Sequence, residues 1–271
     1  MSNHLLRDHA PISDANWELL DDEARERLSV LLAARKLVDF SGPHGWEYSA
    51  TNLGRVTSVP KAPCDGITAV QRRVLPMVEV RAEFAISRAE LRDDDRGAAD
   101  ADLETLDRAA HQIAVAENRA VFHGWTEAAI TGIAEVSPHQ GLQLGNEPSS
   151  YPRPVASAVE LLLRSGIAGP YALALGNEEY KQVVETAEGG GYPLLEHLRQ
   201  IVKGPLVWAP GVQGAIVLSM RGGDFVLDCG QDLSVGYASH DAENVSLYIE
   251  ESYSFRVLTP EAAVAIAPAK R

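Results

Sequence analysis

The segment between residues 46 and 86 constrains the fold of this chain most, because its sequence is extended and offers no means of burying itself. The strand-like run Leu53–Val59 is followed by a stretch interrupted by proline and glycine, and then by the run Met77–Ile86. In this second run, charged side chains alternate with apolar ones, which is typical of a strand with one packed face. Together the two runs predict a long two-stranded ribbon. An isolated ribbon is only marginally stable in water, so we expect it to pack on another part of the molecule or on another subunit.

The composition is that of a folded globular protein. The 271 residues suffice for one large or two small domains, and 45% of them are hydrophobic and 23% charged. The chain has 24 basic and 38 acidic side chains, which give a formal net charge of -14. Because phosphate groups attract positive surfaces, this charge argues against binding to nucleic acid or to an anionic membrane. We expect neither among the partners.

The sequence also indicates the cellular compartment of the protein. Its two cysteines, Cys64 and Cys229, are too few for a disulfide framework and fit a reducing compartment. The N-terminal residues lack the apolar core of a signal peptide, and no apolar run approaches the roughly 18 residues that a membrane span requires. We therefore expect a cytoplasmic protein without a leader or a membrane anchor.

An amphipathic helix is expected near the N-terminus, where Ser13 can act as the N-cap. Its apolar stripe recurs every three or four positions and ends before Gly42 and Pro43, which stop it. The members of this stripe are Trp17, Leu20, Ala24, Leu28, Leu31 and Arg35. Two interpretations stay open: the stripe packs within its own domain, or part of it receives a partner.

The next segments predict an acidic loop and then a long helix. Leu91–Asp102 contains the run Asp93–Asp95, but adjacent carboxylates point apart, so we expect a solvated loop rather than a metal site. Leu103–Gly124 repeats apolar residues at helical spacing and would be about 30 Å long, the scale of a domain's spine. His111 and His123 lie three turns apart on it, too far to share a metal, so we expect structural histidines.

The second half predicts mixed helices and strands after a turn-rich connector at 132–154. The expected elements are helix Val155–Arg164, strand Tyr171–Leu175, helices Glu178–Thr186 and Pro193–Val202, and strands Ala215–Met220, Asp224–Leu227, Leu233–Tyr237 and Val245–Leu258. These segments, with the helices before them, place the chain in the α+β class.

Familiar catalytic motifs are missing from the sequence. The chain lacks a Gly-x-Ser-x-Gly elbow, a Cys-x-x-Cys pair, a His-Glu-x-x-His helix and an EF-hand loop. Gly189–Gly191 is not followed by the Lys-Ser/Thr of a phosphate-binding loop, so we expect an exposed tip. Glu250 and Glu251 are neighbours in a strand and face opposite sides, and Cys229 has no basic neighbour to activate it. The sequence thus predicts a protein that is not an enzyme and holds no metal.

A set of short motifs runs along nearly the whole chain, from residue 5 to about residue 265. The N-terminal ones are Leu5–Arg7, Ala10-Pro11, Trp17, Arg35–Asp39 and Gly42–Tyr48. The later ones are Leu75–Arg81, Asp95–Gly97, Gly169–Tyr171, Tyr192–Leu194, Arg221–Phe225 and Gly230–Tyr237. In this order the motifs resemble those of the encapsulins, a family also called linocins. One such string would mean little, but the collinear set makes the match specific.

The resemblance implies an α+β fold like that of tailed-phage major capsid proteins, the Hong Kong 97-like fold. This fold combines a peripheral domain, an extended loop and an axial domain. The implied segments are an N-terminal arm and helix at 1–45, an extended β-loop at 46–88, the peripheral domain with its spine helix at 89–150, the axial domain at 151–212, and a C-terminal β-rich segment at 213–271 that returns to both domains.

The resemblance also implies a function. Encapsulin protomers self-assemble into an icosahedral bacterial nanocompartment that encloses a cargo enzyme, which is bound through its own C-terminal targeting peptide. The implied cargo is a dye-decolorizing peroxidase or a ferritin-like iron-storage protein, with roles in oxidative stress or iron storage. Carried onto this sequence, the residues that dock the peptide are Leu28, Leu31, Leu32, Arg35, Asp39, Ile249 and Glu251. A structural role stays open for some of them: Leu28 and Leu31 as core, and Arg35 with Asp39 as a surface ion pair on one helix.

Two further expectations follow from the resemblance. The five-fold pore loop, which admits small molecules or ions, comprises Thr186, Ala187, Glu188, Gly189, Gly190 and Gly191. A ring of Glu188 side chains would favour cations. Some relatives hold a flavin against an aromatic residue just before the acidic segment, but the matching residue here is Ala89, so we expect no cofactor.

Three other functions are compatible with parts of the sequence: a viral capsid subunit, a soluble hydrolase-type enzyme with an unrecognised site, and a secreted bacteriocin-like protein. A viral subunit should carry a long N-terminal scaffold region, and a secreted protein should carry a signal peptide. An enzyme should work as a small oligomer. The shell interpretation explains best why the predicted ribbon needs a partner, since repeated contacts between identical copies close into rings and shells.

Overall fold

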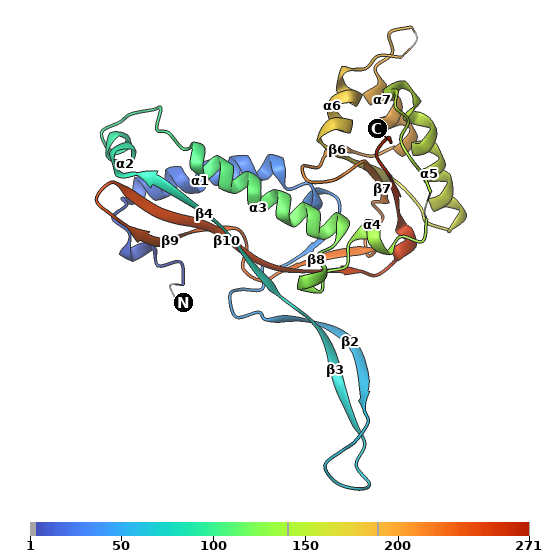
Figure 1. Ribbon diagram of the computed structural model, residues 1–271, viewed down its shortest axis with the longest axis horizontal. Helices are drawn as coiled ribbons and strands as arrows, with labels where there is room; N and C mark the ends of the chain where they lie inside the picture. The colour runs from blue at the N-terminus through green and yellow to red at the C-terminus, as the bar shows by residue number, and fades with distance from the viewer. Residues whose placement is uncertain (1–3, 140, 189, 271) are drawn as a thin grey trace.

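A computed structural model describes residues 4–139, 141–188 and 190–270 of the chain. Its α-helices are α1 (Asp14–Leu31), α2 (Arg88–Asp95), α3 (Glu104–His123), α4 (Ile133–Val136), α5 (Pro152–Arg164), α6 (Asn177–Glu185) and α7 (Leu194–Val202). Figure 1 shows two lobes, one with α1 and α3 and the other with α5, α6 and α7, and a long two-stranded ribbon that projects from the first lobe.

The strands form two sheets and the ribbon. The first lobe holds β1 (Asp39–Ser41), β8 (Phe225–Cys229), β10 (Asn244–Val257), β4 (Val78–Ser87) and β9 (Ser234–His240). The second lobe holds β11 (Ala263–Ile266), β7 (Ala215–Ser219), β5 (Tyr171–Leu175) and β6 (Leu206–Trp208). The ribbon consists of β2 (Ala50–Val59) and β3 (Ala69–Pro76).

Strand β10 organises the first sheet. It pairs antiparallel with β4 along one edge, from Asn244 opposite Ser87 to Tyr253 opposite Val78. Along its other edge it pairs first with β9 and then with β8, and β1 joins β8 in parallel. Helices α1 and α3 lie across this sheet (Figure 1).

Helix α1 begins where the sequence predicted. The Ser13 side chain accepts a hydrogen bond from the backbone N–H of Asn16 at 3.2 Å, which caps the first turn. The predicted apolar stripe from Trp17 to Leu31 is buried against α3 and the sheet, so this part of the prediction is confirmed. Extending the stripe to Arg35 was wrong, because the helix ends at Leu31 and Arg35 lies in a separate 3-10 turn, η2 (Ala34–Lys36).

The Asn118 side chain on α3 stabilises the turn that follows the end of α1. Its side-chain amide donates to the carbonyls of Leu31 at 2.9 Å and Pro210 at 3.1 Å. Its Oδ1 accepts from the backbone N–H of Ala34 at 3.0 Å. One buried side chain thus satisfies backbone groups from the end of α1, from η2 and from the β6–β7 loop of the second sheet.

Helix α3 is the predicted spine, and it belongs to both hydrophobic cores. Leu106, Ala110 and Ile113 pack in the core of the first lobe, whereas Val121 and Phe122 pack in the core of the second. The two lobes are therefore joined by continuous helical packing.

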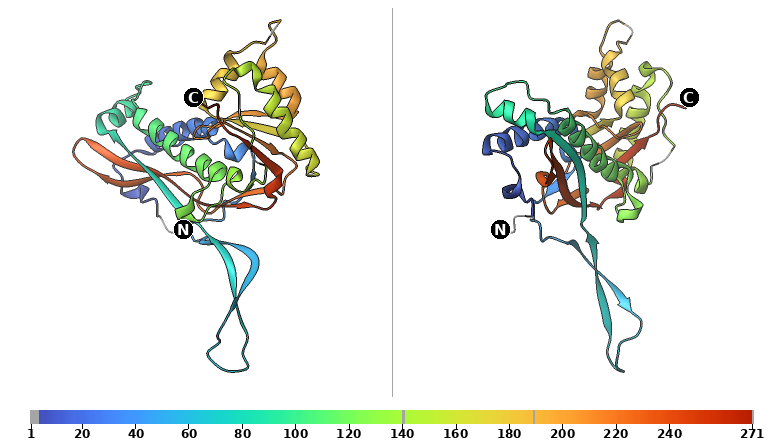
Figure 2. Two further views of the ribbon diagram at one scale, coloured as in Figure 1. Left: turned by 45° about the vertical axis from the view of Figure 1, so that its right-hand side comes forward. Right: turned by 60° about the vertical axis from the view of Figure 1, so that its left-hand side comes forward.

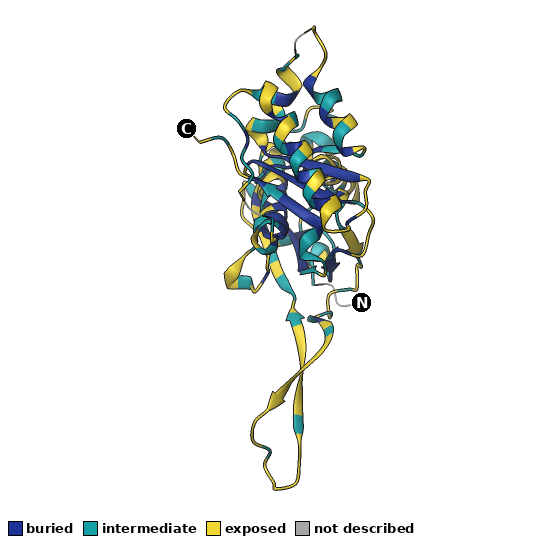
Figure 3. Cartoon of the chain, turned by 90° about the vertical axis from the view of Figure 1, so that its right-hand side faces the viewer, coloured by how far each residue is buried: buried dark blue, intermediate teal, exposed yellow. Residues whose placement is uncertain are grey.

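The second strand of the ribbon is not the one that the sequence predicted. Its strands are β2 and β3, paired from Ala50 opposite Pro76 to Val59 opposite Ala69. The alternating run Met77–Ile86, predicted as the second ribbon strand, instead forms most of β4 in the first sheet. Its apolar positions, such as Phe84 and Ile86, are buried in the core, so the alternation reflects a sheet with one packed face. Figure 3 shows that the true ribbon is exposed along most of its length.

The acidic segment also differs from the prediction of a loop, because α2 occupies its first part. Ser87 caps this helix by accepting from the backbone N–H of Ala89 at 3.1 Å, and Leu91 is buried in the first core. Asp95 accepts from Ser13 Oγ and Asn16 Nδ2, both at 2.6 Å, and so ties α2 to the start of α1. This carboxylate therefore has a structural role.

We predict that Asn118→Ala destabilises the protomer by at least about 2 kcal/mol, because the N–H of Ala34 and the carbonyl of Pro210 would each lose a partner at roughly 1–3 kcal/mol, while the Leu31 carbonyl keeps the N–H of Ala33. The midpoint of urea denaturation measures this effect. Arg108→Ala, on the exposed side of the same helix, serves as the control and should shift the midpoint little. Equal midpoints for the two variants would contradict the role given to Asn118.

Candidate functional site

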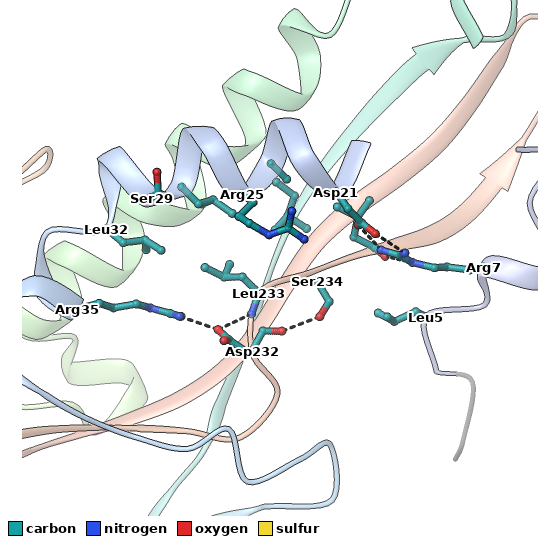
Figure 4. A pocket seen from close by; sticks show the side chains of 14 residues that line it. Leu5, Arg7, Asp21, Arg25, Ser29, Leu32, Arg35, Asp232, Leu233 and Ser234 are labelled. Carbon is teal, nitrogen blue, oxygen red and sulfur yellow. Dashed lines mark hydrogen bonds and ion pairs between the residues drawn. The ribbon is translucent and has the colours of Figure 1, made fainter. Parts of the chain in front are cut away.

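A groove of about 540 Å³ lies between α1 and the turn that leads into β9. Figure 4 shows Arg25, Ser29 and Leu32 on one side of it and Asp232–Ser234 on the other, with Arg7 at one end and Arg35 at the opposite end. The residues that line it are Leu5, Arg7, Asp21, Ala24, Arg25, Leu28, Ser29, Leu32, Arg35, Asp232, Leu233, Ser234, Val235 and Ile249.

The floor of the groove is apolar. Leu28 lies one turn after Ala24 on the buried side of α1, and Leu32 follows at the helix end. Val235 and Ile249 are paired residues of β9 and β10 and share one face of the sheet. Aliphatic side chains of an occupant would be removed from water together with the apolar atoms of this floor.

The N-terminal end of the groove is fixed by Arg7. Its guanidinium makes two hydrogen bonds to the Asp21 carboxylate, at 2.8 and 2.6 Å, and donates through Nε to the carbonyl of Val235 at 2.8 Å. It also lies 4.5 Å from the centre of the Trp17 ring. The carbonyl of Leu5 accepts from the backbone N–H of Tyr237 at 2.9 Å, so the N-terminal segment is held across both walls.

The opposite end of the groove is built on a buried ionic cluster. Arg35 donates through Nε to Glu117 at 2.7 Å, through Nη1 to Asp232 at 2.6 Å and through Nη2 to Glu251 at 2.7 Å. The Glu117 and Glu251 side chains are fully buried, whereas that of Asp232 is 43% exposed. Burial opposes the charge of Arg35, but the three carboxylates raise its pKa above the ordinary value. Arg35 is therefore permanently charged and has a different acceptor for each nitrogen.

The predicted docking residues divide into two groups. Leu28, Leu32, Arg35 and Ile249 line the groove together. Leu31, Asp39 and Glu251 do not: Leu31 packs in the core, and Asp39 lies on β1, where it accepts from the backbone N–H of Gly223 at 2.5 Å. Glu251 lies behind Arg35. The alternative of an Arg35–Asp39 pair on one helix is wrong, because the two residues follow the end of α1 and have other partners.

Several residues that line the groove were not among the predicted docking residues. They come from the N-terminal segment (Leu5 and Arg7), from α1 (Asp21), and from the turn before β9 and the start of that strand (Asp232, Leu233 and Val235). Two of the motifs quoted for the family resemblance, Leu5–Arg7 and Gly230–Tyr237, contain most of them. Because most of these groove residues fall within two of the family motifs, the motifs themselves indicated that these positions could belong to the site.

The predicted pore loop connects α6 and α7 at the tip of the second lobe, far from the ribbon (Figure 2). The backbone N–H of Glu188 donates to the carbonyl of Tyr192 at 2.8 Å, and Gly190 and Gly191 take positive φ angles that suit glycine. Glu188 Oε2 lies 2.8 Å from His197 Nδ1 on α7, so this carboxylate already has a partner within the protomer. Gly189 lies outside the described residues.

Sites for other chemistry are not apparent in the described part of the chain. No group of three or more His, Cys, Asp and Glu residues there is arranged to hold a metal ion. None of its helices combines the length and apolar character needed to cross a membrane. Burial raises the pKa of the Cys229 thiol to about 12, so the thiol stays protonated at neutral pH. Ala89, in the first turn of α2, has no ring on which a flavin could stack.

Comparison with known proteins decides the family. The sequence profile of the family described as "encapsulating protein for peroxidase" matches residues 2–254. A type 1 encapsulin shell protein of Rhodospirillum rubrum is 49% identical over 267 residues, which cover 97% of this chain and 95% of that protein. The type 1 encapsulin shell protein of Rhodococcus erythropolis is 42% identical over 265 residues, with coverage of 97% and 99%. The chain belongs to the encapsulin family.

Solved structures show the fold of this encapsulin. The virus-like particle of Pyrococcus furiosus aligns with a TM-score of 0.66 over 92% of this chain and 98% of that chain, at 17% identity. A chain of Gordonia phage Cozz aligns with a TM-score of 0.55 over 89% and 87%, at 12% identity. The predicted Hong Kong 97-like capsid fold is confirmed. As an encapsulin, the chain is a structural shell protein rather than an enzyme.

We predict that Arg35→Ala destabilises the protomer by roughly 3–5 kcal/mol, because it leaves the buried carboxyls of Glu117 and Glu251 without a cation. Chemical denaturation measures this effect. Arg25→Ala at the exposed rim of the groove is the matched control and should change stability by no more than about 0.5 kcal/mol. A loss at Arg35 as small as that at Arg25 would show that the cluster does not hold this end of the groove.

Proposed function

We propose that copies of this chain assemble into a closed icosahedral shell, a cytoplasmic nanocompartment that encloses a cargo protein. The observation that carries this proposal is the ribbon, which leaves its own lobe and exposes apolar side chains to solvent. In the family fold such a loop reaches a neighbouring subunit. The proposal includes the division into peripheral segments, the extended loop at 46–88 and the axial domain at 151–212.

One face of the ribbon carries three exposed valines. Residues directly opposite each other in an antiparallel pair share a face, so Val56 lies beside Arg72 and Val70 beside Ser58. Because alternate residues of β3 point the same way, Val70, Arg72 and Val74 are also on one face. The three valines are 57%, 62% and 48% exposed. A second copy of the chain that covered them would remove this apolar surface from water.

The charge of the ribbon suits the same partner. Residues 50–76 contain four basic side chains, Arg55, Lys61, Arg72 and Arg73, and one acidic side chain, Asp65, in a chain whose net charge is -14. Arg55 lies directly opposite Arg73, an arrangement that is unfavourable in an isolated ribbon. An acidic surface, such as most of this chain presents, would relieve that repulsion.

The groove is proposed as the dock for the targeting peptide at the C-terminus of the cargo. Its apolar floor accepts aliphatic side chains, and its two ends are fixed by Arg7 and Arg35. A peroxidase is the favoured cargo, since the family is described as encapsulating a peroxidase. A ferritin-like iron protein is the second candidate, because a protein of Pyrococcus furiosus that is 22% identical over 209 residues is a ferritin-like–encapsulin fusion. Pores at the α6–α7 tips are proposed to admit small molecules or ions.

Electron microscopy after size-exclusion chromatography tests the proposed function. We expect uniform hollow particles that elute near the void volume, and a second protein band in the same fraction when the shell is purified from its native cell. A monomer or dimer over a range of salt concentration and pH would overturn the proposal.

We predict that Val70→Asp abolishes particle formation while the protomer stays folded, because this side chain is 62% exposed in the protomer. A buried carboxylate at the contact between copies would be strongly unfavourable. Light scattering measures assembly, and circular dichroism measures folding. Val70→Ile keeps the face apolar and should still assemble; intact particles from Val70→Asp would disprove the role of the valine face.

We predict that Leu233→Asp leaves the shells intact but weakens cargo retention by about 10- to 100-fold, the effect of losing roughly 1.5–3 kcal/mol of apolar contact. The ratio of cargo to shell protein in purified particles measures retention. Val30→Asp is the matched control, because Val30 is 55% exposed on the same helix as Leu28 but does not line the groove. Equal cargo ratios for the two variants would argue against docking in the groove.

A further inference from the structure

Two buried glutamates behind the groove each have one oxygen without a hydrogen-bond donor. Glu117 and Glu251 accept from Arg35 through their Oε2 atoms. Their Oε1 atoms are buried and accept no hydrogen bond from the described residues. Because the two Oε2 atoms accept from Nε and Nη2 on one edge of the same guanidinium, each at 2.7 Å, the two carboxyl groups lie side by side. Two carboxylates that face each other away from water repel, unless a proton lies between them.

The charges around Glu117 and Glu251 also favour a proton between the two carboxyl groups. The guanidinium of Arg35 donates hydrogen bonds to three carboxyl groups. Of these three, only that of Asp232 is exposed to solvent. The other titratable groups that face the pair are the Tyr253 hydroxyl on β10 and the Cys229 thiol on β8. Burial raises the pKa of both, so both are neutral and supply no positive charge. With all three carboxyls ionised, the cluster would carry an excess of two negative charges.

We propose that Glu117 and Glu251 share one proton at neutral pH, and that this proton holds Arg35 and the end of the groove in place. The proton lies in a hydrogen bond between the two carboxyl groups, while the other oxygen of each accepts from Arg35. The cluster then has one negative charge in excess, which Asp232 exposes to solvent. The pair titrates as a unit, so the proton belongs to neither glutamate alone.

The direction of the pH effect follows from burial. Burial raises the pKa of Glu117 and raises that of Glu251 well above its ordinary value of 4.5, and repulsion from Glu117 adds to the latter shift. The folded protomer therefore holds a proton that the unfolded chain has released. This contribution to stability is complete below pH 4.5 and decreases as the pH rises through the pKa of the folded state. A paired carboxylate with a lowered pKa would have the opposite dependence.

The consequence for the groove rests on the proposed docking function. When the pair loses its proton, the second buried negative charge competes for Arg35, and the wall that Arg35 and Asp232 form loosens. We expect shells to release cargo more readily at alkaline pH. Glu251→Gln places a neutral amide where the protonated carboxyl lies, so retention in this variant should no longer respond to that proton.

Infrared difference spectroscopy of the full-length protein tests the proton itself. At neutral pH the carbonyl stretch of a protonated carboxylic acid should be present, should shift in D₂O, and should be lost in Glu251→Gln. Glu117→Gln provides a second variant in case the first fails to fold. Superimposable spectra of the wild type and both folded variants would overturn the proposal, and this result would leave the docking function untouched, since no cargo is present.

The pH dependence of unfolding gives an independent readout. Between about pH 6 and the pKa of the folded pair, the unfolding equilibrium constant of the wild type should rise by up to tenfold per pH unit more than that of Glu251→Gln. Glu104→Gln, an exposed position at the start of α3, is the control and should follow the wild type. Parallel curves for the wild type and Glu251→Gln would refute the shared proton. A pH-independent cargo ratio with the infrared band present would refute only the link to docking.

Discussion

A two-stranded ribbon that contacts its own protomer only near its base is the constraint on which this structure depends. Its strands β2 and β3 pair with each other, and the valines of one face remain exposed. Two strands alone do not make a stable unit in water. In the proposed shell, the remainder of the molecule acts as the base of the ribbon, and another copy of the chain supplies the surface that the ribbon lacks.

The rigidity of that base comes from contacts between segments that are distant in the sequence. Helix α3 packs in both cores, and its Asn118 side chain joins the end of α1 to the β6–β7 loop of the second sheet. Arg35 joins η2, α3, β10 and the turn before β9 through three carboxylates. A buried ionic cluster contributes little net stability compared with apolar packing, but removing one member is strongly unfavourable. Its effect is to fix the relative positions of the segments, including both walls of the groove.

Local patterns were enough to predict much of the fold. The Ser13 cap, the spine helix and the strand Tyr171–Leu175 all depend on residues that are close in sequence, and they were predicted within one or two residues, whereas the end of α1 was placed too late in the chain. The ribbon was assigned incorrectly because strand periodicity shows that one face is packed but not which strand is the partner. Strand β4 satisfies the same pattern by pairing with β10, more than 150 residues later in the chain.

The groove was only partly predictable for the same reason. Leu28 belongs to the predicted stripe of α1, whereas the docking roles of Leu28, Leu32 and Ile249 came from the family resemblance. The environment of Arg35 depends on residues 82, 197 and 216 positions away, which no local pattern relates to it. The carboxyl pair of Glu117 and Glu251 was invisible in the sequence because one member lies on a helix and the other on a strand. Only the fold brings them together.

The measurement that tests the central claim most directly is a cryo-electron microscopy reconstruction of the purified full-length protein. The account predicts closed particles in which the ribbon of each subunit lies on a neighbouring copy, with Val56, Val70 and Val74 buried in the contact. Particles whose ribbons extend freely into solvent, or a protein that forms no particles, would contradict it.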